Sequence, residues 1–338
     1  MPSRWRAGWG LPNVDCGSND AVCGGDVAPV GQVTRRDPGA LPLRLTACAE
    51  GPAGLWVLDE GHPDAAYGGN KLRKLVDILR VAREQGVTDL LTYGAVGSHH
   101  VLATAVHGAA LGLRTHAVLI PQPDHPHVRR QALRNMAALS SWEAVRLVAA
   151  VPLASARLVA RVVTRHGRRP FVIPPGGSSV VGTTGWVVAG RALAAQRPGA
   201  TVVVASGSGG TAAGLFAGGC RVVAVRVGPR ALTHRARLVR LGRRAARRAG
   251  VASEGSLVVD GSYLAGGYGR TDQRTERALA WGRAQGWPME PTYTAKALAA
   301  ALDRVARGEV VFVQTASGVA PPVPDKVLPA AIESLLVG

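Results

Sequence analysis

The chain has 338 residues, 47% of them hydrophobic and 43 of them glycine, so it is long enough to bury one large core or two smaller ones. Its four cysteines, Cys16, Cys23, Cys48 and Cys220, lack CxxC spacing and a neighbouring histidine pair, so they support neither a zinc site nor a disulfide framework and fit a reducing compartment. The formal charge of +18 would suit nucleic acid or acidic membranes, but we attribute it to arginines scattered over helix faces.

Neither a signal-peptide run nor an apolar stretch of about 18 residues is visible, which predicts a soluble α/β protein of the cytoplasm that does not bind membranes. Residues 1–36 are rich in Gly, Pro, Asp and Asn without periodicity and are predicted to be a loose arm. Alternation at Leu43–Leu45 and the apolar run Leu55–Leu58 predict the first strands.

The stretch Tyr67–Lys74 (YGGNKLRK) follows. Apolar residues from Leu72 to Ala82 recur at helical spacing and Gly86 stands beyond them, so Lys71 is expected in the first turn of an amphipathic helix.

Strands and helices then alternate over residues 85–177, which predicts a small α/β domain inserted into a larger one. Ser98 suits the N-cap of the first of these helices, and Gly112 stands beyond its end. The predicted strands are Leu90–Tyr93, His116–Ile120, Val145–Val148 and Phe171–Ile173, and the predicted helices are Ser98–Leu111, Val128–Leu139 and Leu153–Arg165.

A helix at Thr183–Ala195 leads into Thr201–Ala205, a β-branched run typical of a buried parallel strand. A glycine loop, the helix Ala212–Ala217 and the strand Val222–Val227 continue a parallel sheet with right-handed crossovers. We predict a large domain from residues 37–84 and 178–325, and a C-terminal helix at 326–338.

Lysine is rare in this chain, with four against 36 arginines, and two of the four stand at positions 71 and 74. Arginine keeps its proton in proteins, whereas a desolvated lysine becomes a free amine that attacks a carbonyl and forms a Schiff base. Lys71 is therefore a candidate nucleophile, and Gly68 and Gly69 would let the backbone approach a flat ligand. The alternative is a plain glycine turn into a surface helix.

The loop Gly207–Thr211 (GSGGT) stands between a predicted strand and helix, where backbone N–H groups and the helix N-terminus favour a phosphate. It lacks the Gly-Lys-Ser/Thr ending of a nucleotide P-loop, and no acidic residue near Val227 would pair with a ribose. A small organic phosphate thus fits better than ATP or NAD, and a structural turn remains the alternative. A Schiff-base lysine and a phosphate cup are the two anchors that pyridoxal 5'-phosphate requires.

Six motifs occur in the order found in the 1-aminocyclopropane-1-carboxylate deaminase and D-cysteine desulfhydrase family, which the chain resembles from about residue 41 to 318. They are Gly68–Lys74, Gly94–His100, Pro174–Ser179, Ser206–Thr211, Gly267–Gly269 and Glu290–Lys296. The resemblance implies a tryptophan-synthase-β-like, fold-type-II enzyme with two open twisted, mostly parallel α/β domains and pyridoxal 5'-phosphate in the cleft between them.

The resemblance also implies the site residues. Lys71, preceded by Asn70, would carry the Schiff base and act as the base near the substrate Cα. Ser98 would lie beside the substrate carboxylate at a helix N-terminus. Tyr268 and Tyr293 match the two active-site tyrosines, although core aromatics remain the alternative. The phosphate would rest on Gly207, Ser208, Gly209, Gly210 and Thr211.

Thr294 matches the position near the pyridine nitrogen, where the ring-opening members carry Glu. A hydroxyl leaves that nitrogen largely neutral and weakens the electron sink, which favours β-elimination of a good leaving group. We therefore predict a lyase or deaminase that resembles D-cysteine desulfhydrase and releases a 2-oxo acid and ammonia. Ring opening, β-replacement or dehydration, and a catalytically altered binding protein are the alternatives.

His99 stands where the family has the Asn that contacts the cofactor's 3'-oxygen, and it could donate the same hydrogen bond or mark a changed activity. His99, His100 and His107 lack a carboxylate partner, so we predict no metal site. The arginines of Arg235–Arg248 lack interleaved aromatics, which favours a solvated helix face over nucleic-acid binding. The expected partner is a small amino acid, with a homodimer as a further possibility from the resemblance.

Overall fold

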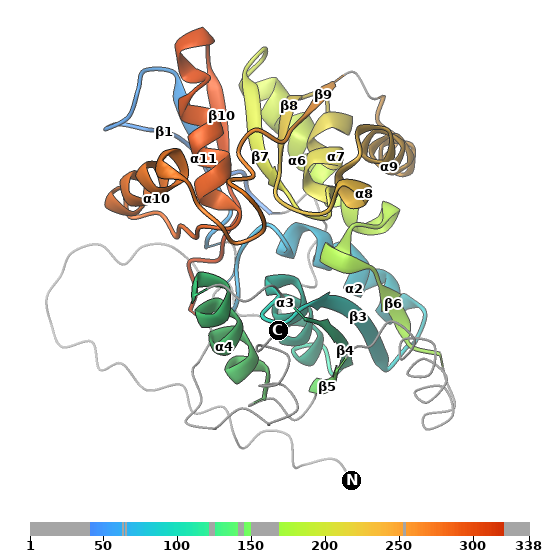
Figure 1. Ribbon diagram of the computed structural model, residues 1–338. Helices are drawn as coiled ribbons and strands as arrows, with labels where there is room; N and C mark the ends of the chain where they lie inside the picture. Colours follow the sequence, from blue (N-terminus) through green and yellow to red (C-terminus); the bar gives the residue numbers. More distant parts are fainter. Residues whose placement is uncertain are drawn as a thin grey trace, which may run out of the picture.

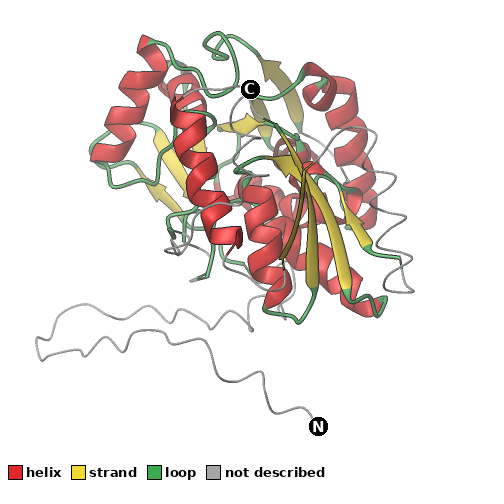
Figure 2. Ribbon diagram, turned by 60° about the horizontal axis from the view of Figure 1, so that its bottom comes forward, coloured by secondary structure: helices red, strands yellow, loops and turns green. Residues whose placement is uncertain are grey.

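The computed structural model describes residues 41–62, 64, 66–121, 126–140, 145–149, 169–252 and 255–320. The predicted arm at 1–36, the helix at 153–165 and the C-terminal helix at 326–338 lie outside these residues. Two sheets divide the molecule into the upper and lower halves of Figure 1, and Figure 2 shows helices on both sides of the strands. This arrangement confirms the predicted α/β fold with mostly parallel sheets.

The larger sheet has six strands in the order β1-β2-β10-β7-β8-β9. Its strands are β1 (Leu45–Ala47), β2 (Leu55–Asp59), β7 (Thr201–Ser206), β8 (Arg221–Arg226), β9 (Ser256–Asp260) and β10 (Val310–Gln314). Every pair is parallel except the edge pair β1 and β2. The central strand β10 is buried along its whole length because both faces of the sheet are covered.

Helices from the C-terminal part cover the two faces of the larger sheet (Figure 1). One core joins the strands to α6 (Val180–Gln196), α7 (Gly210–Ala217) and α9 (Arg235–Arg248). The other joins them to α10 (Gln273–Ala284) and α11 (Thr294–Leu302). The short helices α8 (Arg230–Thr233) and η3 (Val305–Arg307) complete this half.

The smaller sheet has four parallel strands in the order β5-β4-β3-β6. They are β3 (Asp89–Ala95), β4 (Arg114–Ile120), β5 (Val145–Ala149) and β6 (Phe171–Ile173), with α3 (His99–Ala109), α4 (Pro126–Ser140) and η2 (Pro175–Gly177). Every strand of this smaller sheet falls where the sequence places one, as do the two predicted helices of this half that the structure describes, within three residues at each end.

Helix α2 (Leu72–Glu84) connects the two halves. Its residues Leu75, Ile78 and Leu79 belong to the core of the smaller sheet. At its start, the indole of Trp186 on α6 donates to the carbonyl of Asn70 at 3.1 Å. Residue 71 is thereby fixed where the two halves meet. The predicted domain boundaries after residues 84 and 177 stay a prediction.

Among the helices of the described residues, none is both long and apolar enough to cross a membrane.

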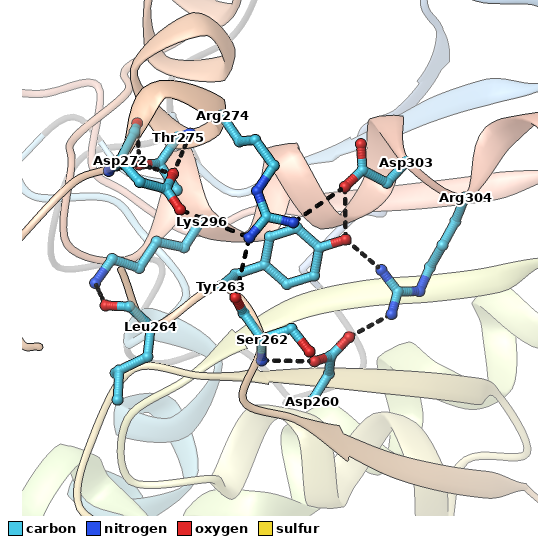
Figure 3. A network of polar contacts seen from close by, with 10 residues as sticks. All are labelled: Asp260, Ser262, Tyr263, Leu264, Asp272, Arg274, Thr275, Lys296, Asp303 and Arg304. Carbon is cyan, nitrogen blue, oxygen red and sulfur yellow. Dashed lines mark hydrogen bonds and ion pairs between the residues drawn. The ribbon is translucent and has the colours of Figure 1, made fainter. Parts of the chain in front are cut away.

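A polar network holds the loop between β9 and α10, which contains residues 261–272 (Figure 3). The Asp260 carboxylate accepts from the Ser262 N–H at 2.8 Å and contacts the Arg304 guanidinium. The Tyr263 hydroxyl donates to Asp303 at 2.8 Å. Both ends of the network stand on regular elements, so the loop is anchored to the sheet and to α11.

The buried Lys296 of α11 anchors the middle of the same loop. Its Nζ donates to the carbonyls of Leu264 and Gly267, each at 2.8 Å, and Figure 3 shows the first of these bonds. Burial lowers the pKa of Lys296 to about 8, against the opposing charges of Glu290 and Asp272. The ammonium thus fixes the turn immediately before Tyr268.

Replacing Lys296 by methionine is expected to destabilise the protein by about 1–3 kcal/mol, because two carbonyls lose their donor in a buried place. Urea unfolding followed by circular dichroism measures the change. The control is Arg277→Met, which removes an exposed guanidinium from α10 and should cost less than about 1 kcal/mol. Equal losses in the two variants would contradict an anchoring role for Lys296.

Candidate active site

A cavity of about 600 Å³ lies between the two halves. Its wall combines the start of α2, the loop between β3 and α3, the β7–α7 loop and the loop that carries Tyr268. The residues predicted from motifs that are more than 200 positions apart therefore meet in one place. Those on the wall are Asn70, Lys71, Ser98, His99, Gly207, Ser208, Gly209, Thr211, Tyr268 and Tyr293.

Lys71 is the N-cap of α2, one position before the predicted first turn. Its Nζ donates to Asn70 Oδ1 at 2.7 Å, and Asn70 Nδ2 donates to Thr211 Oγ1 at 3.0 Å. Burial lowers the pKa of Lys71 to about 8, with the negative charge of Glu290 opposing it. About a tenth of the amine is therefore unprotonated at pH 7, which suits a nucleophile or a base.

The glycine loop forms a cup at the end of β7. Gly209 is the N-cap of α7 with φ of +84°, and a Cβ there would lie 2.0 Å from Leu238 Cδ2. A Cβ on Gly210 would lie 2.5 Å from Ser178 Oγ. Neither position has room for a side chain, so the loop comes close to the start of α7, whose N–H groups other than that of Gly210 can face an anion.

Two residues that the sequence reasoning did not assign complete the cup. Lys74 Nζ donates to the Gly176 carbonyl at 3.0 Å and to Ser178 Oγ at 3.3 Å. Ser178 donates to Ser208 Oγ at 2.8 Å and accepts from the Gly210 N–H at 3.0 Å. Burial, with the charges of Lys71 and Arg237, holds the pKa of Lys74 well below its ordinary value. Because lysine is rare in this sequence, its presence at positions 71 and 74 was a signal that both residues have a specific role.

Ser98 caps α3 and accepts from the Val101 N–H at 3.5 Å. Ser98 and the first residues of α3 line the cavity, where the N-terminus of the helix would stabilise a carboxylate. The next residue, His99, stacks on Tyr67 at a ring-centroid distance of 6.2 Å.

Tyr268 and Tyr293 form a pair on the cavity wall. Their hydroxyl oxygens lie 2.9 Å apart and their rings meet edge to face, with centroids 5.9 Å apart. Burial raises the pKa of Tyr268 to about 12 and that of Tyr293 well above its ordinary value. Both hydroxyls are therefore protonated at neutral pH. One donates to the other, which leaves the hydrogen of the second for a ligand.

Two predicted cofactor residues do not line the wall. Gly210 is buried against Ser178, as described above. Thr294 accepts from the Glu290 N–H at 2.8 Å and donates to the Glu290 carbonyl at 3.0 Å. The Glu290 carboxylate accepts three backbone N–H groups at 2.7 Å and does line the cavity. Glu290 thus shapes the turn before α11, a role that sequence reasoning missed.

The sequence profile described as "Pyridoxal-phosphate dependent enzyme" matches residues 38–315, most of the chain. The chain belongs to this family. Its members bind pyridoxal phosphate, so the predicted cofactor and enzyme class are confirmed.

Several solved structures resemble the chain over most of its length. An ACC deaminase homologue has 29% identity and a TM-score of 0.65, and the match covers 84% of this chain and 88% of that one. O-ureido-L-serine synthase has 15% identity and a TM-score of 0.54, covering 89% and 98%. O-acetylserine sulfhydrylase isoform 3 from Entamoeba histolytica has 16% identity and a TM-score of 0.54, and the match covers 95% of this chain and 99% of that one. The last two show the fold alone.

The cavity of this pyridoxal-phosphate-dependent enzyme fits its cofactor on three counts. The Lys71 amine is free of a carboxylate partner among the described residues and is held by an amide oxygen. The glycine cup would clash with any side chain, and the Lys74 amine adds a donor beside it. Together these residues would hold an aldehyde at one end and a phosphate at the other.

The pKa of Lys71 predicts how fast the cofactor-free protein captures the aldehyde. Only the unprotonated amine attacks, so the capture rate should rise about tenfold from pH 6.5 to 7.5 and level off above about pH 8. Stopped-flow absorbance after mixing with pyridoxal phosphate measures the rate, with Lys71→Ala protein as the blank. A rate that does not change over this range would contradict the lowered pKa.

Proposed function

We propose that the protein catalyses α,β-elimination on a small amino acid in the manner of a D-cysteine desulfhydrase. The amino acid loses its β-substituent as a thiol or similar group and, with one water, yields a 2-oxo acid and ammonia. The bound cofactor would supply an electron sink for the pair released at the substrate Cα.

The residues of the cavity divide this chemistry between them. Lys71 Nζ would remove the Cα proton, since its lowered pKa leaves a usable fraction of free amine. Ser98 and the start of α3 would hold the substrate carboxylate. The Tyr268 and Tyr293 hydroxyls, protonated and bonded to each other, would donate a proton to the leaving group.

The single observation that carries elimination over ring opening is the hydroxyl at position 294. Thr294 lies at the N-terminus of α11 with its side chain bonded to the Glu290 backbone, so it brings no carboxylate to a pyridine nitrogen. The Glu290 carboxylate on the cavity wall already accepts three backbone N–H groups. A largely neutral nitrogen makes a weaker sink, which suffices when the β-substituent leaves readily.

The test is the loaded enzyme with D-cysteine, assayed for sulfide, 2-oxo acid and ammonia. L-cysteine and a β-chloro amino acid of each hand define the enantiomer and the leaving group. Equal amounts of the three products from D-cysteine are expected, and their absence from every one of these substrates would refute elimination. Cofactor that is bound and reducible in an inactive protein would favour a binding role.

Ring opening is a second candidate because the structure with 29% identity is an ACC deaminase homologue. The same assay with 1-aminocyclopropane-1-carboxylate separates the two, since ring opening gives ammonia and a four-carbon 2-oxo acid without sulfide. Thr294→Glu should raise ring opening relative to elimination if the residue at 294 sets the charge of the ring nitrogen.

A further inference from the structure

The first turn of α9, the arginine-rich helix Arg235–Arg248, closes the back of the glycine cup. Arg237 Nη1 donates to the Ser208 carbonyl at 3.1 Å and to the Leu232 carbonyl at 2.6 Å. A Cβ on Gly209 would lie 3.4 Å from the same Leu232 oxygen, so the turn before α9 lies directly behind the cup. Ser208 and Leu232 line the cavity, whereas Arg237 does not. Arg237 therefore binds the cup from the outside.

The bond to Arg237 fixes the direction of the peptide between Ser208 and Gly209. No described peptide bond is cis, and the C=O and N–H of a trans peptide point in opposite directions. Because the Ser208 carbonyl is directed at Arg237, the Gly209 N–H is directed away from it. Gly209 lines the cavity, and its N–H has no hydrogen-bond partner among the residues that the structure describes. This N–H is a free donor at the cup.

The charge of Arg237 forms no ion pair within the described part of the chain. Both of its acceptors are carbonyls, and its side chain is half-buried. Arginine keeps its proton, so the guanidinium stays positive behind the cup. Its charge reaches Lys74 inside the cavity, where it is one of the causes that lower the pKa of that lysine. A half-buried cation without a counterion favours an anion nearby, and a phosphate in the cup would supply one.

We propose that Arg237 is a positioning residue of the phosphate cup. It holds the Ser208 carbonyl, so that the Gly209 N–H is turned to the cofactor's phosphate, and it places a positive charge behind that anion. Arg237 does not touch the phosphate and acts through the Ser208–Gly209 peptide, whereas Lys74 donates to the cup from the cavity wall. This role rests on the proposed placement of the phosphate in the cup and is independent of the proposed elimination.

Ser–Gly peptides allow the orientation to be measured directly. The chain has three of them, at Ser206–Gly207, Ser208–Gly209 and Ser317–Gly318. Full-length protein made by cell-free synthesis with ¹³C-carbonyl serine and ¹⁵N-glycine gives one carbonyl–amide NMR signal from each. The signal of Ser208–Gly209 is assigned by its loss in Ser208→Ala. The Gly318 N–H donates to the Gly61 carbonyl at 2.8 Å, so its signal shows whether each variant is folded.

The Gly209 amide signal of the wild type should move when pyridoxal phosphate is added. Pyridoxal brings no anion and should move it much less. In Arg237→Met the Ser208 carbonyl signal should move even without cofactor, and the response of Gly209 to pyridoxal phosphate should be largely lost, because the peptide is free to turn. In Lys74→Met the Ser208 carbonyl signal should stay in place. An unchanged Gly209 response in Arg237→Met would overturn the proposal.

The affinity of the cofactor-free protein for its cofactor gives a second measure. Arg237→Met should weaken the binding of pyridoxal phosphate about tenfold and leave that of pyridoxal nearly unchanged, as measured by quenching of protein fluorescence. Arg237→Lys keeps a cation and a donor on a long stem and should restore part of the loss. Arg244→Met removes an exposed charge about two turns further along α9 and should leave both affinities unchanged.

Two results of the affinity measurement would contradict the role of Arg237. Equal losses for the two ligands in Arg237→Met would mean that the residue only supports the fold. An equal loss of affinity for pyridoxal phosphate in Arg244→Met would mean that net charge alone causes the effect. If D-cysteine gives no product, the proposed elimination fails, while the NMR signals and the two affinities still decide whether Arg237 positions the cup.

Discussion

Replacing Lys71 by alanine is expected to lower kcat/KM for elimination at least about a thousandfold, because the variant loses the amine that removes the Cα proton and the covalent anchor of the cofactor. Borohydride reduction of the loaded wild type followed by peptide mapping should tag Lys71. The alanine variant should carry no tag at position 71 and should bind the cofactor only reversibly.

Lys71→Arg is the matched control for charge, since arginine keeps a cation at the start of α2 but cannot give up its proton. It should be as inactive as the alanine variant. Lys74 lies in the same cavity and is the obvious rival. A tag on Lys74 in the wild type, or substantial activity in Lys71→Arg, would show that the nucleophile has been misassigned.

Replacing Lys74 by methionine should weaken pyridoxal phosphate binding about tenfold to a hundredfold. The substitution removes one charge-assisted hydrogen bond from the phosphate cup, a loss of about 1.5–3 kcal/mol. Quenching of protein fluorescence during titration of the cofactor-free protein measures the affinity. Methionine keeps much of the length of lysine, so packing between α2 and Ser178 changes little.

Pyridoxal without its phosphate provides the control ligand. Its affinity should be nearly equal in the wild type and in Lys74→Met, since it brings no anion to the cup. A similar loss of affinity for both ligands would mean that Lys74 supports the cavity wall and does not bind the phosphate. An unchanged affinity for pyridoxal phosphate would mean that Lys74 is not part of the phosphate site.

The sequence by itself determined the local elements of this protein and the pieces of its site. Helices such as α2 and α9 were recognised because a polar face alternates with an apolar one at helical period. By contrast, α11 and β10 were not recognised, because they are buried on every side and show no such alternation. The scarcity of lysine in the sequence pointed to Lys71, and the run of small residues at Gly207–Thr211 pointed to the phosphate cup. Few other residue types could take their place at these positions.

Only the tertiary structure decided which side chains meet. Ser178 completes the cup from a loop about 30 residues before it, and Tyr67 reaches His99 from the loop before α2. Thr294 was predicted beside the cofactor, but its hydroxyl is bonded to the backbone of Glu290, four residues earlier. Periodicity reports how each segment is buried, whereas contacts between distant side chains depend on how α2, α3 and α7 pack around the cleft.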